Sequence, residues 1–226
     1  MTTIINMKIM LFAHLLLFSG MMAGLTITSP SEAATVLNGA QSSATEAVKG
    51  TIDDLIQVLE NETLKQPEQA KERRHEIEEV IMRRVDYKEM ARRALGAPWS
   101  TLSPREQHEF VNLFVQLLRD TFVGRITEHS DEQVAVAYVG ETREDAFAEV
   151  KTQIKGRKID TPVDFRLIHR AHEWRVYDVV IDGASIVSNY RSQFTSIIRD
   201  VSYVGLVKKM KQKAIAVKAF EKYPAP

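Results

Sequence analysis

The stretch WRVYDVVIDGASIVSNYRSQF, from Trp174 to Phe194, joins an apolar segment, a turn and a helix in one run. Residues 174–181 are apolar on both faces of an extended chain, which is typical of a strand covered on both sides. Asp182-Gly183 is a turn signal, and Ser185 is placed to cap the helix that follows. The stretch therefore predicts a sheet whose last long strand leads directly into a helix.

The segments before this strand have the period of strands as well. Apolar and polar residues alternate near residues 134–138, 146–154 and 163–167. Short polar connections, such as Glu141–Asp145, separate them. Together with residues 174–181 they predict an antiparallel meander of four strands.

Helical periodicity dominates on both sides of these strands. Asp86 to Glu89 and Ser103 to Glu106 have the spacing of capping boxes, and Gly96 is placed just past a helix end. Helices followed by a sheet and then by helices predict one α+β unit. The predicted helices cover residues 44–60, 67–84, 86–95, 104–127, 190–201 and 206–220.

The N-terminal residues 1–33 have the layout of a secretory signal peptide. Lys8 precedes an apolar run over residues 9–25, and the small-residue site 31–34 follows. We expect cleavage after residue 33 or 34, which leaves a single domain over residues 34–226. An uncleaved membrane anchor is the alternative, because the apolar run approaches the ~20 residues of a membrane span.

Composition narrows the function classes. Thirty basic and thirty acidic residues leave no net charge, which argues against binding to bulk nucleic acid. The chain has no cysteine, so no disulfide supports the fold and the core must hold it alone.

The sequence offers little catalytic chemistry. His75 and His108 lack the second histidine that a metalloprotease helix requires, and Gly183-Ala184-Ser185 lacks the second glycine of a nucleophile elbow. Asp178 and Asp182 have a spacing that permits general acid–base work, but Asp-Gly is also a common turn. We therefore predict no catalytic residue, no metal site and no cofactor.

Several motifs in one frame closely resemble the signature of the Ttg2/MlaC (toluene tolerance) family. The resemblance extends from about residue 48 to 210 and departs at Ser202, where a glycine is common in the family. The tail over residues 214–226 looks particular to this chain. The matching segments are Trp174-Arg175-Val176-Tyr177-Asp178-Val179, Asp182-Gly183-Ala184-Ser185, Asn189-Tyr190-Arg191-Ser192-Gln193-Phe194 and, upstream, Asp86-Tyr87, Met90, Leu95-Gly96 and Trp99.

The resemblance implies a twisted antiparallel sheet of about four strands packed on helices, with an apolar lipid cavity between them. It implies a soluble periplasmic carrier that binds phospholipid as cargo and moves it between the outer and inner membranes. Its partners would be an inner-membrane ABC transporter with an MCE-type ring and an outer-membrane lipoprotein–porin complex. A carrier for another lipid, such as a hopanoid, and an enzyme acting on an apolar substrate remain the alternatives.

The residues expected to line or support the cavity come from the long helix, the sheet and the helix after the turn. The alternative is that these side chains fill one another's space as in any core, and sequence does not distinguish a hollow core from a packed one. The predicted lipid-binding residues are Phe110, Phe114, Leu117, Leu118, Phe122, Val136, Tyr138, Val163, Phe165, Trp174, Val176, Tyr190 and Phe194.

Two groups of basic residues are candidates for contact with charged partners. A lipid head group should stay at the cavity mouth, because burying an unpaired phosphate is costly. Arg166, Arg175 and Arg191 are the candidate neighbours of the head group. The basic C-terminal helix is either a surface for anionic lipid or a partner, or a solvated face. Its lysines are Lys208, Lys209, Lys211 and Lys213.

Overall fold

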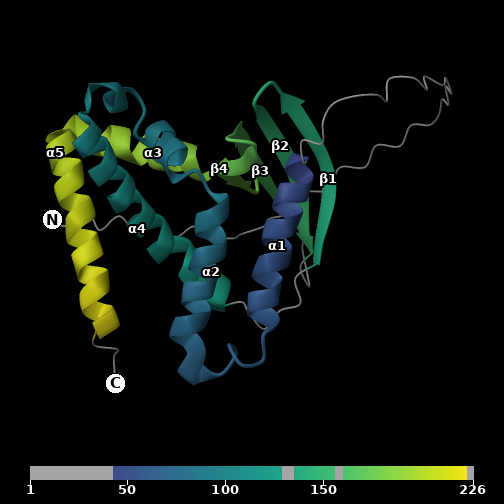
Figure 1. Ribbon diagram of the computed structural model, residues 1–226. Helices are drawn as coiled ribbons and strands as arrows, with labels where there is room; N and C mark the ends of the chain where they lie inside the picture. The colour runs from purple at the N-terminus through teal and green to yellow at the C-terminus, as the bar shows by residue number, and fades with distance from the viewer. Residues whose placement is uncertain (1–42, 129–134, 156–159, 223–226) are drawn as a thin grey trace, which may run out of the picture. The chain divides into compact units, whose positions relative to one another are not determined.

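Helices flank a single antiparallel sheet in the computed structural model (Figure 1). The structure describes residues 43–128, 135–155 and 160–222, with side chains up to residue 120 in the first range and 212 in the last. The predicted signal peptide lies outside these ranges. The elements are α1 (Ala44–Glu60), η1 (Pro67–Gln69), α2 (Ala70–Arg84), α3 (Tyr87–Leu95), η2 (Ala97–Thr101), α4 (Pro104–Glu128), β1 (Ala135–Glu144), β2 (Phe147–Lys155), β3 (Thr161–Arg170), β4 (Glu173–Ile181), β5 (Ala184–Ser185) and α5 (Ile186–Lys222).

The sheet has the order β1-β2-β3-β4-β5, and every neighbouring pair is antiparallel. The α+β meander is thus confirmed, with a short fifth strand that the sequence did not predict. The expected connection Glu141–Asp145 is wrong, because Glu141 to Glu144 continue β1 and pair with β2. Asp145, with φ 51°, begins a two-residue turn that lets the strands run to their ends.

Two bulges change which residues share a face of the sheet. In β4 the partners step from Arg166↔Asp178 to Leu167↔Val176, so Tyr177 is an extra residue. Because Arg166 and Leu167 point to opposite faces, Val176 and Asp178 do so too. A second bulge in β1 leaves Val139 without a partner, and this side chain is 63% exposed.

The two faces of the sheet are covered by different helices. Helix α1 packs on β1, β2 and β4 and covers what we call the inner face (Figure 1). The start of α5 and helix α3 contact β4, and their contacts with Asp178 and Tyr177 lie on what we call the outer face. Val85, between α2 and α3, forms a parallel bridge to Val176 and so extends the sheet beside β4.

Buried apolar side chains form two clusters. The sheet cluster contains Ala44 and Val48 of α1 with strand residues of the inner face, including Val150 and Leu167. The helix cluster lies among α3, α4 and α5. Val85 packs against both clusters and connects them. The sheet and the helical part therefore share an edge, and each has a core of its own.

Capping explains where the helices start. The Ser103–Glu106 box forms, and a second one at Ser43 starts α1. Asp86 accepts a hydrogen bond from the Glu89 amide at 2.9 Å, but the reciprocal half of the predicted box is absent. The Glu89 carboxylate binds arginines instead.

Helix α5 consists of two helices joined at a kink. Ser202, with φ 68° and ψ 173°, interrupts the helical backbone between them. The first part begins at Ile186, directly after the predicted cap Ser185. The predicted break before Leu206 falls at Ser202. Within the described ranges, the helices are all too short or too polar to cross a membrane.

Candidate functional site

The inner face of the sheet and the helix above it form an apolar site that is closed at one end. At the closed end Ala44 and Val48 are fully buried against Trp174 and Val176. One turn further along α1, Ile52 is only partly buried at the edge of the sheet cluster. Contact between helix and sheet thus loosens towards the C-terminal end of α1.

The helix continues its apolar stripe beyond this contact. Leu55 and Leu59 follow Ile52 at i+3 and i+7, so they lie on the same side of α1. Both are partly exposed. Val136 and Ile154, which are paired across β1 and β2, are partly exposed as well. Apolar side chains on both the helix and the inner face are therefore only partly buried.

Six predicted lipid-binding residues lie together on the inner face. The register pairs Tyr138 with Thr152 and Thr152 with Val163, which aligns their side chains across three strands. Trp174 has the Arg143 guanidinium over its ring, with its carbon 4.9 Å from the ring centroid. The six residues are Val136, Tyr138, Val163, Phe165, Trp174 and Val176.

The predicted residues from the helices lie elsewhere, in the helix cluster. Phe114 and Tyr190 meet edge to face with centroids 5.4 Å apart, and Phe110 and Phe194 do so at 5.7 Å. All four rings are buried, and such contacts are those of a packed core. Leu118 is buried in the same cluster and Leu117 packs against it, whereas the side chain of Phe122 lies outside the described part.

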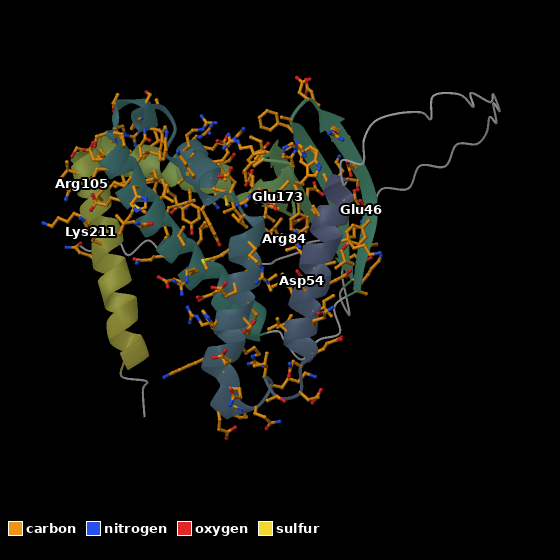
Figure 2. The ribbon with its side chains drawn as sticks, in the orientation of Figure 1. Glu46, Asp54, Arg84, Arg105, Glu173 and Lys211 are labelled. Carbon is orange, nitrogen blue, oxygen red and sulfur yellow. The ribbon has the colours of Figure 1, made fainter. Side chains whose placement is uncertain are left out.

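A groove of about 650 Å³ lies between α1 and α2. Apolar Val58 and Val80 line it together with polar side chains. Asp54 and Arg84 reach towards each other across the two helices at 3.6 Å (Figure 2). The predicted lipid-binding residues are absent from its lining. Its further lining residues are Gln57, Asn61, Thr63, Leu64, Glu72, Glu76 and Arg83.

Asp178 joins the sheet to α5. Its carboxylate, in a residue only 3% exposed, accepts hydrogen bonds from the Ser185 hydroxyl at 2.6 Å and the Val187 amide at 3.0 Å. Arg166 donates a third at 3.2 Å. Ser185 in turn accepts from the Ser188 amide, which confirms it as a helix cap. These contacts give Asp178 a structural role.

The neighbouring Asp182 lies in the turn before β5. It is exposed with φ 49°, and Gly183 follows with φ 77°. Such positive angles suit a two-residue hairpin turn, and Asp and Gly adopt them readily. The predicted turn is therefore confirmed, and it separates Asp182 from Asp178.

The arginines proposed for the head group are engaged away from the inner face. Arg166 binds Glu149 and Asp178, and Arg175 pairs with Glu173 at 3.0 Å. The Arg191 Nε donates to the Arg93 carbonyl at 2.7 Å. No group of three or more possible metal ligands occurs among the described residues.

A buried carboxylate fixes α3 to the β3–β4 hairpin. Glu89, 3% exposed, binds Arg92, Arg93 and Arg170. The hydrogen bond from Arg92 is the main reason that the pKa of Glu89 falls to about 2. The Arg93 guanidinium also lies over the Tyr177 ring, 4.1 Å from its centroid. Its link to the hairpin could not be predicted from the sequence, because Arg170 is 81 residues from Glu89 along the chain.

The comparisons with known proteins agree with this architecture. A solved phospholipid-binding protein from Ralstonia solanacearum, in complex with a phospholipid, aligns with a TM-score of 0.70 and 23% identity, covering 78% of this chain and 99% of that one. The intermembrane phospholipid transport system binding protein MlaC of Haemophilus influenzae is 21% identical over 126 residues, which is 54% of this chain and 59% of that protein. The family model described as MlaC protein matches residues 49–212. The chain therefore belongs to the MlaC protein family.

Proposed function

We propose that this protein binds phospholipid and that the acyl chains lie between the inner face of the sheet and helix α1. The observation that carries the proposal is that apolar side chains of both elements are only partly buried, with Ile52 and Leu55 on the helix and Val136 and Tyr138 on the inner face of the sheet. An exposed apolar surface of this kind marks a ligand or partner site.

The energetics of the cargo require such a site. Two ~16-carbon chains, at ~0.8 kcal/mol per buried CH₂, represent roughly 25 kcal/mol of hydrocarbon that must be kept from water. Outward movement of α1 is the simplest way to admit them. Its C-terminal half is held to α2 through the exposed Asp54–Arg84 pair, and such pairs are weak.

The place of this binding in the cell is the second part of the proposal. The protein is exported by its signal peptide and acts as a periplasmic carrier between the outer and inner membranes. It serves an Mla-type ABC transport system, with an MCE-type ring complex at the inner membrane and a lipoprotein–porin complex at the outer membrane. Family membership and the name of the Haemophilus influenzae relative support this role.

We further propose that the protein has no catalytic activity. In the enzyme hypothesis Asp178 would act as an acid or base, but its oxygens already accept three hydrogen bonds on the outer face. A carrier for a different lipid, such as a hopanoid, would use the same apolar site and differ only in its cargo.

Mass spectrometry of the protein purified gently from a Gram-negative periplasm tests both parts. We expect a bound phospholipid and a chain that begins near residue 34. Protein that is empty and takes up no phospholipid from vesicles would contradict the binding site. A hopanoid in place of phospholipid would identify the other cargo, and an intact residue 1 would contradict cleavage.

A further inference from the structure

The kink in α5 exposes an apolar corner. Val204 is 75% exposed and Val201 is 44% exposed, on either side of the non-helical Ser202. A Cβ atom on Gly205 would lie 2.7 Å from Cγ2 of Val201, so the chain approaches itself closely here. This close approach fixes the position of Val201 beside the start of the second helix.

Lysines follow on the same side of that helix. Val204 and Lys208 are one turn apart, which places them on one face. Leu206 and Met210, on the opposite face, are buried in the helix cluster. The second half of α5 is therefore anchored by one side and presents an exposed valine and a lysine on the other.

The charge of this surface is not balanced by its neighbours. Lys211 pairs with Glu109 of α4, and Arg199 lies 3.7 Å from Asp200. Lys208 and Lys209 are exposed, and neither forms an ion pair with the part of the chain whose side chains are described. Figure 2 shows Lys211 on the same stretch of α5. Lys208 and Lys209 thus add two positive charges to this stretch of α5 that are unpaired among the described side chains.

We infer that Val201, Val204, Lys208 and Lys209, here called the α5 corner, contact the surface of an anionic phospholipid bilayer. Valine side chains enter the boundary between head groups and acyl chains, and lysines beside them attract lipid phosphates. A stable protein interface buries about 800 Å² on each partner, far more than two valines supply. A bilayer requires no matching shape, so the corner fits it better.

This inference goes beyond the proposed carrier function, since it concerns an outer surface and not the cargo. Flotation of the purified protein with vesicles tests it, using phosphatidylcholine alone and phosphatidylcholine with about 30 mol% phosphatidylglycerol. We expect binding to the anionic vesicles only, lost at about 0.5 M NaCl, where charges are screened within a few ångströms. Equal binding to both vesicles would overturn the inference.

Variants locate the contact. The double change Lys208→Gln and Lys209→Gln should weaken binding about 25-fold, from about fivefold per lysine. Val204→Asp should abolish it, whereas Val139→Asp, at a valine on β1 that is 63% exposed, should retain it. Unchanged vesicle binding by the α5 variants overturns the inference. It is also overturned if these variants still bind vesicles but lose binding to a membrane protein.

The bound lipid of each variant is measured in parallel. Loss of vesicle binding with retained cargo supports the α5 corner as a separate surface. Protein that lacks cargo but still binds anionic vesicles contradicts the proposed carrier function and leaves this inference intact.

Discussion

The Asp178 carboxylate and the Ser185 hydroxyl form a 2.6 Å hydrogen bond that joins the end of β4 to the beginning of α5. The same carboxylate accepts from the Val187 amide and from Arg166. One buried acid thus caps a helix and balances an arginine on the outer face. Asp178, which the sequence suggests as a catalytic acid, therefore connects β4 to α5.

Asp178→Asn should therefore destabilise the protein without emptying the proposed lipid site. We expect a loss of about 2–4 kcal/mol in the free energy of unfolding, since the change leaves Arg166 with one carboxylate fewer and the amide group cannot replace every accepted bond. Urea denaturation measures it. Asp182→Asn, in the exposed turn, should stay within about 0.5 kcal/mol. A fully stable Asp178→Asn protein would contradict the structural role.

A polar residue on the inner side of α1 should weaken lipid uptake. Ile52→Gln places an amide against hydrocarbon, which costs roughly 1–3 kcal/mol and predicts uptake about tenfold weaker. Titration with phospholipid vesicles and mass spectrometry of the recovered protein measure this. Val139→Gln, on the exposed bulge of β1, is the matched control. Equal uptake by the two variants would place the acyl chains elsewhere.

Two glycines should respond to alanine with opposite signs. At Gly205 the new Cβ would meet Val201 at 2.7 Å, so Gly205→Ala should cost about 1–3 kcal/mol of stability. At Gly50, inside α1, a Cβ meets nothing within 4 Å. Gly50→Ala should gain about 0.5–1 kcal/mol from helix propensity. Thermal unfolding of both variants checks the pair, and a stabilised Gly205→Ala protein would refute the close approach.

The backbone at Ser202 favours glycine. Its φ of 68° with ψ of 173° lies in a region that residues with a Cβ rarely adopt. We expect Ser202→Gly to stabilise the protein by about 1 kcal/mol. Ser192→Gly, within the regular first half of α5, should instead cost about 0.5–1 kcal/mol. The same sign for both changes, measured by denaturant unfolding, would argue against the kink.

Glu89 should make the protein sensitive to acid. Its pKa falls from 4.5 to about 2 in the folded chain. Because the pKa is lower in the folded chain than in the unfolded chain, Glu89 stabilises the protein at a pH above its unfolded pKa. This contribution is lost as pH falls from about 5 to 2. The contribution should reach about 2–3 kcal/mol. Glu89→Gln should flatten the fall in unfolding free energy over this range, with the exposed Glu60→Gln as a surface control.

Local signals in the sequence predicted much of the fold. The change of hydrophobic period found the strands, the box at Ser103 found the start of α4, and Gly96 marked the end of α3. Asp182-Gly183 predicts a turn and Ser185 predicts a helix cap, and the structure has both. These features depend on neighbours within a few residues, which is why sequence alone reveals them.

Features that depend on distant partners escaped prediction. The bulges follow from register between strands, and the Glu89 network joins α3 to a hairpin some 80 residues later. The predicted lipid-binding set combines residues of the sheet cluster and of the helix cluster. Aromatic residues such as Phe114 and Tyr190 occur both in packed cores and in cavity walls, so residue type does not separate the two. Only three-dimensional packing shows that the rings of Phe114 and Tyr190 contact each other edge to face, while Ile52 is only partly buried.

The extra residue at Tyr177 acts as a shift of phase along β4. Before it Trp174 and Val176 point to the inner face of the sheet, and after it Asp178 points to the outer face. In a strand of unbroken alternation the carboxylate would share the side of Val176 and stand among hydrocarbon. One inserted residue therefore lets the first half of β4 present apolar side chains to the inner face, while the next residue presents an ion-paired carboxylate to the outer face.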